Sequence, residues 1–299
     1  DFLASTDIIT VSVLVTATDD DAATATDTIL LTIQGTNDAP TITVGTIANT
    51  ATEAGVDGSG ETVDTANATG ISDSLFANAS DVDTATADFF VSKAALSGFT
   101  LVEVTEDSTA SSGGSQVVGD YGTLTVGSDG SYSYAIDNNN ADIQALDENS
   151  SESESFSIEI SDGAGGSVVE TLVITINGTN DAPTVSGATV ADEAVEAGID
   201  SSGDAVAGSA ATGDADALFA NTSDVDDVLT FVVSKAALTG ETLVAVTSNS
   251  TASTNGSSVS GDYGTLVVGS DGSYSYVVDD TNAVIQALDE NASETESFS

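Results

Sequence analysis

The chain has 299 residues, of which only two are Lys or Arg and 49 are Asp or Glu, so its formal net charge is −47. It contains no His, Cys, Met or Trp, which excludes imidazole and thiol nucleophiles, thiolate zinc sites and disulfide bonds. Phosphate recognition needs the basic residues that this chain lacks, so we expect no nucleic-acid partner. We also expect no enzymatic activity.

The excess of carboxylates bears on folding as well. Hydrophobic residues make up 40% of the chain, so it can fold if salt or bound cations screen its self-repulsion. Ca²⁺ is the expected cofactor, because Asp, Asn and carbonyl oxygens are its usual ligands.

No apolar run approaches the ~20 residues of a membrane span. The sequence begins Asp1-Phe2-Leu3 without an initiator Met or a signal segment, and we expect it to be a piece of a longer protein.

The chain is organised as tandem repeats. Gly-Thr-Asn-Asp-Ala-Pro occurs at 35–40 and again at 178–183, so the period is 183 − 40 = 143 residues. We therefore expect three parts. They are the C-terminal strands of a preceding repeat (1–40), one complete repeat (41–183), and a third repeat that lacks its last strands (184–299).

Within the complete repeat the dominant hydrophobic period is two, which indicates strands. Leu124 and Val126 share one face of a strand, and an Asp-Gly turn at 127–130 leads into a second strand with Tyr132 and Tyr134. These tyrosines are expected in the core rather than on a sugar-binding surface. Two longer alternating stretches follow at 156–160 and 168–176, and 140–146 suits at most a short surface helix. The pattern predicts an all-β fold of sandwich repeats.

These motifs resemble a known family. The runs YGTLTVGSDGSYSY at 121–134, ESFSIEISDGAGG at 154–166 and GTNDAP at 178–183 are similar to the VCBS repeat of large bacterial RTX-type surface adhesins. The resemblance implies cadherin-like or immunoglobulin-like β-sandwiches. It also implies export to the bacterial cell surface, often by a type I secretion system, and a role in adhesion or biofilm formation.

The linkers between repeats resemble the calcium-binding linkers of cadherins, which implies metal ligation by Asn37, Asp38, Asn180 and Asp181. The alternative is a proline-terminated turn that only ends the last strand. Calcium is favoured because the motif lies at the repeat boundary, where stiffening would act.

A second pair of carboxylates recurs as Asp-Val-Asp, at Asp81 and Asp83 and again at Asp224 and Asp226. If the segment is a strand, both carboxylates face one side and repel each other unless a cation lies between them. These four residues are therefore candidate ligands.

A third group of candidate ligands consists of loop acids, for which solvated carboxylates are the commoner explanation in so acidic a chain. They are Asp19, Asp162, Glu53 and Glu196.

The leading functional hypothesis is a structural extender, in which calcium at each boundary turns a string of sandwiches into a stiff stalk. Its expected partners are neighbouring repeats or copies, with surface or matrix glycans bound by regions outside this segment. One alternative is direct carbohydrate or homophilic binding by the repeats. In another, residues 1–34 supply the strands missing from the third repeat of a neighbouring copy. The two ends of the sequence are complementary in this sense, but the simpler explanation is that the sequence is an arbitrary segment of a longer chain.

Overall fold

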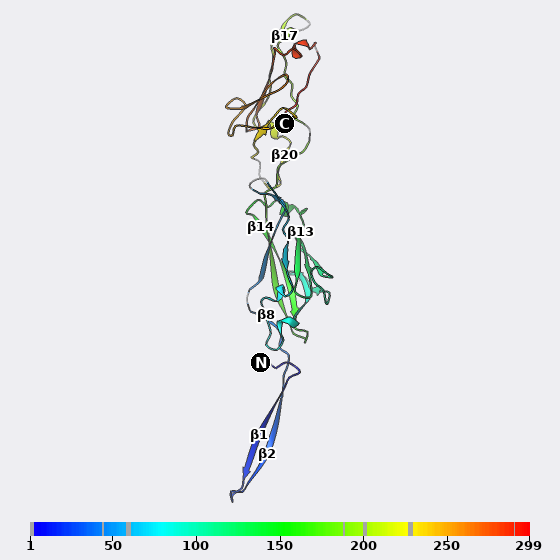
Figure 1. The fold of residues 1–299 in the computed structure, drawn as a ribbon, viewed down its shortest axis with the longest axis vertical. Coiled ribbons are helices and arrows are strands. Elements are labelled where there is room, and N and C mark those ends of the chain that lie inside the picture. The colour runs from blue at the N-terminus through cyan, green and yellow to red at the C-terminus, as the bar shows by residue number, and fades with distance from the viewer. Residues whose placement is uncertain are drawn as a thin grey trace. The chain divides into compact units, whose positions relative to one another are not determined.

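The computed structural model of the chain describes residues 3–43, 45–57, 61–187, 189–199, 202–226, 230–289 and 291–299. It contains two compact units, Asp1–Ala182 and Pro183–Ser299. β-Strands are the main regular secondary structure of both (Figure 1), which confirms the predicted all-β class. Across the described ranges, no helix has the length and apolar character needed to cross a membrane.

The first unit begins with a β-hairpin, drawn in blue in Figure 1. Strands β1 (Ile8–Thr18) and β2 (Thr24–Gln34) pair antiparallel along their full length, with Ile8 opposite Gln34. All residues of both strands are exposed. The hairpin therefore has an alternating apolar sequence but no core of its own.

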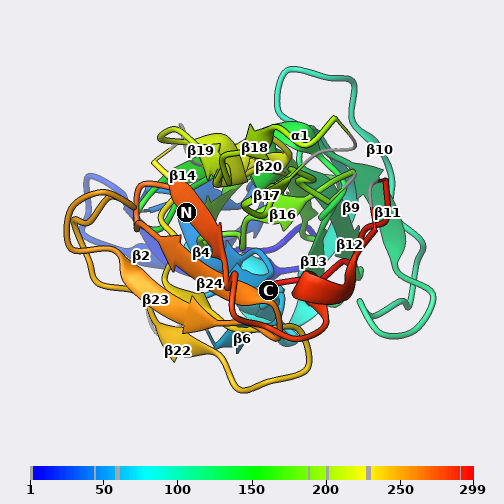
Figure 2. The ribbon, with the colours of Figure 1, turned by 90° about the horizontal axis from the view of Figure 1, so that it is seen from above.

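Two sheets follow and form a sandwich. The larger sheet has the order β10-β9-β14-β15-β4, comprising Val102–Glu103, Phe90–Leu96, Ser151–Ser161, Ser167–Asn177 and Ile47–Thr52. The smaller sheet has the order β11-β12-β13-β7, comprising Ser115–Val118, Gly122–Val126, Tyr132–Ile136 and Ala68–Gly70. Figure 2 shows β9 beside β10 and β11 beside β12. Strand β4 pairs with β15 in parallel, whereas the other pairs within these two sheets are antiparallel.

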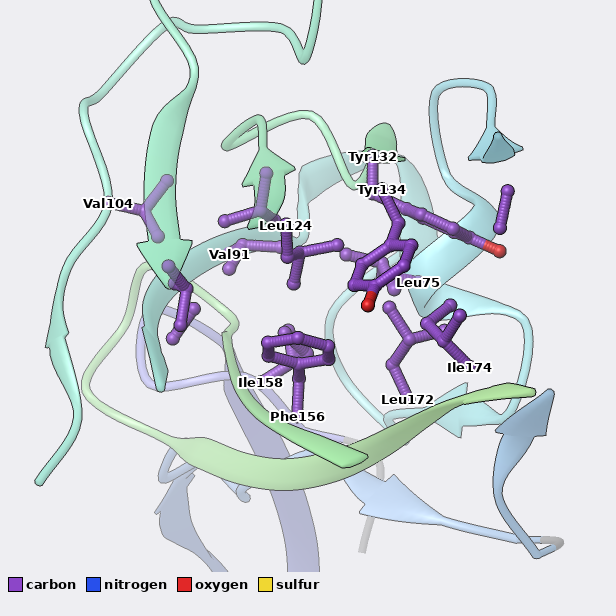
Figure 3. Close-up of a cluster of buried hydrophobic side chains, with 14 of the residues drawn as sticks. Leu75, Val91, Val104, Leu124, Tyr132, Tyr134, Phe156, Ile158, Leu172 and Ile174 are labelled. Atoms are coloured by element: carbon purple, nitrogen blue, oxygen red, sulfur yellow. The ribbon is translucent and has the colours of Figure 1, made fainter. Parts of the chain in front are cut away.

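The core lies between the two sheets. Figure 3 shows Leu124 and Tyr134 of the smaller sheet facing Phe156, Ile158 and Leu172 of the larger one, and all five are fully buried. Their alternation along the strands follows from the two-residue period, which places every second side chain on the same face. Tyr132 is buried as well, so the predicted core position of both tyrosines is confirmed.

Short elements close the ends of the sandwich. The two-residue strands β3 and β8 pair with each other, as do β5 and β6; they comprise Thr41–Ile42, Ala79–Ser80, Gly55–Val56 and Thr62–Val63. The 3-10 helices η1 and η2 are Ser74–Phe76 and Thr86–Asp88. The predicted short helix is α1 (Ala141–Gln144), and the side chain of Asn140 caps its first turn. It is not purely a surface helix, because Ile143 is fully buried in the core.

The second unit contains only part of this architecture. Its four-stranded sheet has the order β19-β25-β24-β23, comprising Ala211–Gly213, Tyr274–Val278, Gly264–Val268 and Ser257–Ser260. The remaining strands form two-residue pairs, namely β16 with β20, β17 with β18 and β21 with β22; they comprise Thr184–Val185, Thr222–Ser223, Gly198–Ile199, Ala205–Val206, Lys235–Ala236 and Val244–Ala245. The 3-10 helices are η3 (Ala217–Phe219) and η4 (Ile285–Ala287).

Candidate metal centre

The first Asn-Asp linker is held at one end of the sandwich by the pairing of β3 with β8. Thr41 lies opposite Ser80 and Ile42 opposite Ala79. This register brings the residues that precede β3 beside those that follow β8. The backbone N–H of Asp38 accordingly donates to Oδ2 of Asp83 at 3.1 Å.

Asp81 and Asp83 come together by a different route from the one predicted. Strand β8 ends at Ser80, so the two residues do not alternate along a strand. Instead, Oδ1 of Asp81 accepts hydrogen bonds from the backbone N–H of Asp83 at 2.9 Å and of Thr84 at 3.2 Å. This side-chain-capped turn, typical of Asp in loops, folds the second carboxyl group back toward the first.

Asp162 joins the same end of the sandwich from the loop between β14 and β15. Its Oδ1 accepts from the N–H of Ala164 at 2.7 Å and of Gly166 at 2.9 Å, and its Oδ2 accepts from the Asn37 amide at 2.8 Å. Asp162 is 5% exposed, so it is not the solvated loop acid of the alternative interpretation. Burial raises the pKa of Asp162, but hydrogen bonds from Asn37 and these amides outweigh that effect and leave it below its usual value.

The three carboxylates of Asp38, Asp81 and Asp83 form a cluster that is short of hydrogen-bond donors. One oxygen of each is inaccessible to water and accepts no hydrogen bond: Oδ2 of Asp38, Oδ2 of Asp81 and Oδ1 of Asp83. A hydrogen bond with Asp81, burial, and the negative charges of Asp81 and Asp38 raise the pKa of Asp83 against the opposing N–H of Asp38. The cluster thus has excess negative charge and three inward-facing oxygens without hydrogen-bond partners. Buried polar groups rarely lack such partners.

The side chains do not form a ready-made metal site. Nowhere in the part of the chain that the structure describes do three or more acidic side chains converge closely enough to hold an ion. The donor set is nevertheless the one that suits calcium, namely carboxylates beside Asn and backbone carbonyl oxygens. Asn37, whose amide also donates to the carbonyl of Asp38 at 2.7 Å, links the linker to Asp162.

The second linker lies at the other end of the sandwich, where Glu53 meets it. Glu53 is fully buried; its Oε1 accepts from the N–H of Thr179 at 3.0 Å and its Oε2 from the Gln144 amide at 3.3 Å. The amide of Asn180 donates to the carbonyl of Asp181 at 2.6 Å, as Asn37 does to Asp38. Burial again rules out the solvated alternative for Glu53.

The second unit repeats part of this geometry. Asp224 and Asp226 follow β20 as Asp81 and Asp83 follow β8, and the N–H of Asp226 reaches Oδ1 of Asp224 at 3.4 Å. Glu196 is half-buried and accepts from the Gln286 amide at 3.2 Å. The latter contact matches the one between Gln144 and Glu53.

Asp19 is the candidate that the structure leaves as a loop acid. It is exposed, and its Oδ1 accepts from the N–H of Ala23 at 2.7 Å and of Asp21 at 3.1 Å, within the β1–β2 turn. These bonds explain the residue as a turn former.

Two buried glutamates were not singled out from the sequence. Glu154 on β14 is 5% exposed and accepts from the Tyr134 hydroxyl and, at 2.7 Å, from the N–H of Asp120. Glu170 on β15 is 2% exposed. Both occupy the inward face of an alternating strand, with Phe156 and Leu172 as the next inward residues, so the two-residue period could have identified them.

Comparison with protein families gives a match to part of the chain. The family model of the bacterial cadherin-like domain matches residues 37–178. The match begins in the first Asn-Asp linker and ends at the first residue of the second Gly-Thr-Asn-Asp-Ala-Pro motif. Residues 37–178 are therefore similar to the bacterial cadherin-like domain, and the predicted all-β, cadherin-like or immunoglobulin-like fold class is confirmed. The narrower resemblance to the VCBS repeat stays a prediction.

Comparison with curated protein sequences gives no match. Among solved structures, "Protocadherin Gamma B7 extracellular cadherin domains 1-4" is similar at a TM-score of 0.33 and 12% identity, and "PcdhgB3 EC1-4" at 0.34 and 12%. Each alignment covers 92% of this chain and 58% of the other, so this chain spans little more than half their length. Similarity at this level establishes no equivalence between individual residues.

Proposed function

We propose that the chain is a structural extender segment of an extracellular bacterial adhesin or fibre, in which Ca²⁺ at the boundaries between repeats stiffens the stalk. Its role would be to project a binding region from the cell surface, in cell adhesion or biofilm formation. The cadherin-like repeat at 37–178 supports an adhesion-type role and offers no support for an enzyme. Export by a type I secretion system is part of the same proposal.

One observation carries the calcium proposal: the partnerless buried oxygens of Asp38, Asp81 and Asp83. Carboxylate oxygens that are shielded from water and lie close to other negative charges are stabilised by a proton or by a neutralising cation. With two basic residues against 49 acidic ones, the chain has almost no cations of its own for this purpose. A hard divalent ion is the remaining source of positive charge.

The residues that would hold the ion come from three separate segments. Asp38 belongs to the linker, and Asp81 and Asp83 belong to the turn after β8. Asp162 lies in the loop between β14 and β15 and is connected to the linker by its hydrogen bond from Asn37. Bound calcium would neutralise the cluster and tie the linker to the sandwich. The linker could then no longer bend freely, and successive repeats would keep a fixed direction. In the sequence, Asn180, Asp181, Asp224 and Asp226 are the counterparts of Asn37, Asp38, Asp81 and Asp83. Glu53 lies at the end of the first sandwich that carries the second linker, and Glu196 is its counterpart in the next repeat. Asp19 is the counterpart of Asp162 in the preceding repeat.

The affinity needed for this role is modest. Extracellular calcium modules bind at ~10⁻⁴–10⁻³ M. A ~10-fold to ~100-fold excess of Ca²⁺ over Kd would stabilise each occupied site by about 1.4–2.7 kcal/mol.

Thermal unfolding with and without Ca²⁺ tests the proposal. Wild-type protein in EGTA should melt at a lower temperature than protein in excess Ca²⁺. Its small-angle scattering profile should also indicate a more flexible chain. Mg²⁺ should substitute poorly for Ca²⁺ in both measurements. Equal melting temperatures and scattering profiles in EGTA and Ca²⁺ would refute calcium stiffening.

The variant Asp83→Asn sharpens this test, because it removes one ligand and one repelling charge together. In EGTA the variant should be at least as stable as the wild type, since repulsion within the cluster falls. In Ca²⁺ it should be the less stable of the two. Glu106→Gln is the control, because it removes the same charge from an exposed loop position and should leave the response to calcium unchanged.

A further inference from the structure

The dipeptide Asn-Gly occurs twice in the chain, at 177–178 and at 255–256. Asn-Gly is prone to deamidation, because glycine has no side chain to shield its backbone nitrogen from the preceding asparagine side chain and restricts the backbone least. The reaction requires that this nitrogen turn onto Cγ of the asparagine. Its rate in a folded protein therefore depends on how firmly the surrounding backbone is held, and the two dipeptides differ in this respect.

Asn255 lies in the connection between β22 and β23. It is exposed, and its φ of 56° is in the left-handed region, which Asn adopts more readily than most other residues with a side chain. The turn is closed by the backbone of Thr251 and Thr254, each of which donates its N–H to the carbonyl of the other, at 3.0 and 3.1 Å. The backbone bridge of Asn255 is to Thr251, inside the same turn. Rotation of the Asn255 backbone therefore disturbs a local turn and no strand pair.

Asn177 is held much more firmly, as the last residue of β15. Its backbone is paired on both sides, with Ser151 of β14 and with Thr52 of β4. Gly178 is buried, and its N–H donates to the carbonyl of Ser150 at 2.9 Å. The nitrogen that would attack is thus already engaged. Turning it onto the Asn177 side chain would break contacts with two neighbouring strands.

We propose that Asn255 is a site of spontaneous deamidation in the folded protein and that the fold protects Asn177 from the same reaction. The backbone nitrogen of Gly256 forms a bond to Cγ of Asn255, and the side-chain nitrogen leaves as ammonia, taking the proton of the Gly256 N–H. The resulting five-membered succinimide then takes up one water molecule. Hydrolysis of the new bond to Cγ gives aspartate at position 255, and hydrolysis of the original peptide bond gives isoaspartate. Water is the only other reactant.

The complete repeat has the same turn without a reactive residue. The run Ser-Thr-Ala precedes the turn in both repeats, at 108–110 and 250–252, and Gly113 stands where the second unit has Asn255. Gly113 has a φ of 73°, so glycine is compatible with the backbone at this position. The variant Asn255→Gly is therefore a non-reactive form that should keep the fold.

Modification would change both the charge and the backbone of the turn. Either product adds one negative charge, and isoaspartate also adds a carbon atom to the main chain. Gly256 lies close against β24, since a Cβ at this glycine would be 2.7 Å from Cγ1 of Val267 and 2.9 Å from the carbonyl oxygen of Thr251. A lengthened backbone does not fit this space without a shift, so the isoaspartate form should weaken the attachment of the turn to β24.

Prolonged incubation of the full chain in heavy-oxygen water with excess Ca²⁺, followed by peptide mass mapping, tests the proposal. Each deamidated residue acquires one labelled oxygen from the solvent. The peptide that contains Asn255 should carry at least about 10-fold more label than the peptide that contains Asn177, because the reaction at Asn177 must wait for local opening of two strand pairs. Equal labelling of the two peptides in the folded protein, or more label at Asn177, would overturn the proposal.

Two controls separate the effect of the fold from that of the local sequence. In concentrated urea the strand pairs are absent, so labelling at Asn177 should rise to a level similar to that at Asn255. A preference for Asn255 that persists unchanged in urea would contradict protection of Asn177 by the fold. The variant Asn255→Gly should acquire no label in the 251–256 turn, and label found there in that variant would contradict the assignment to Asn255.

Discussion

The two hairpins of the first unit, β1–β2 and β14–β15, have the same length and register but opposite surroundings. Ile8 pairs with Gln34 and Ser151 with Asn177 at equivalent positions. Ile174 is fully buried, however, whereas its counterpart Leu31 is 51% exposed. Strand alternation and turn residues thus specify the hairpin locally, while its contribution to stability depends on the sheet that covers it. Side chains at equivalent positions of the repeat are thus part of a core in one hairpin and of an open surface in the other.

Truncating matched positions should produce the largest difference between the two hairpins. Ile174→Ala removes buried methylene groups and leaves a cavity, so it should lower the free energy of unfolding of the sandwich by about 2–5 kcal/mol. Leu31→Ala should change the same free energy by less than about 0.5 kcal/mol, as at an exposed site. Denaturant unfolding at low protein concentration measures both. Equal losses would mean that β1–β2 packs against the sandwich.

A smaller loss of stability is expected when the Tyr134 hydroxyl, which donates to Glu154 on β14, is removed. Tyr134→Phe leaves one oxygen of buried Glu154 without its donor, which should cost about 1–3 kcal/mol. Tyr276→Phe removes the equivalent bond to Glu296, but that carboxylate is half-exposed, so water compensates and the loss should be smaller. Urea unfolding of the two variants compares them, and a larger loss for Tyr276→Phe would contradict the difference in burial.

The cost of Tyr134→Phe should also depend on pH. Burial raises the pKa of Glu154, and the hydrogen bond from Tyr134 opposes this rise. An acid whose folded pKa lies above its unfolded pKa favours the folded state at acid pH, and this contribution is lost as pH rises through the folded pKa. Without the hydroxyl the charged form is less stabilised. The difference in stability between wild type and variant should therefore be larger at neutral pH than at acid pH.

The smallest effect should come from the ion pair between β9 and β14. Nζ of Lys93 lies 2.6 Å from Oε1 of Glu159, and the two side chains are 34% and 17% exposed. Their mutual attraction lowers the pKa of Glu159 and raises that of Lys93. Because the pair is partly solvated, Lys93→Ala should lower the stability only slightly, and added salt should reduce that loss. Lys235→Ala, at an exposed position, is the control. An effect of Lys93→Ala that is independent of salt would indicate lost packing rather than lost charge.

Much of the fold follows from patterns within short segments. The strands around Leu124 and Tyr134 and the pair β14–β15 were predicted from the two-residue period, because register is local to a hairpin. The parallel pairing of Ile47 with Leu172 was not predictable in this way, since it joins residues far apart in the sequence.

The candidate site was likewise predictable from local sequence patterns only in part. Repetition of the linker and of Asp-Val-Asp pointed to Asp38, Asp81 and Asp83, and the structure brings these three together. It does so through the pairing of β3 with β8 and a capped turn, rather than through strand alternation. The burial of Glu53 and Asp162 depends on distant partners, Thr179 and Asn37, which composition alone could not reveal.

The parallel pairing of β4 with β15 has a mechanical consequence. Strand β4 lies near the start of the repeat and β15 near its end, and they pair over six residues, from Ile47 opposite Leu172 to Thr52 opposite Asn177. Tension applied through the two linkers pulls these strands along their length in opposite directions. The interstrand bonds are then loaded together in shear rather than broken one after another from an end. A repeat closed in this way resists pulling along its length better than peeling from one side.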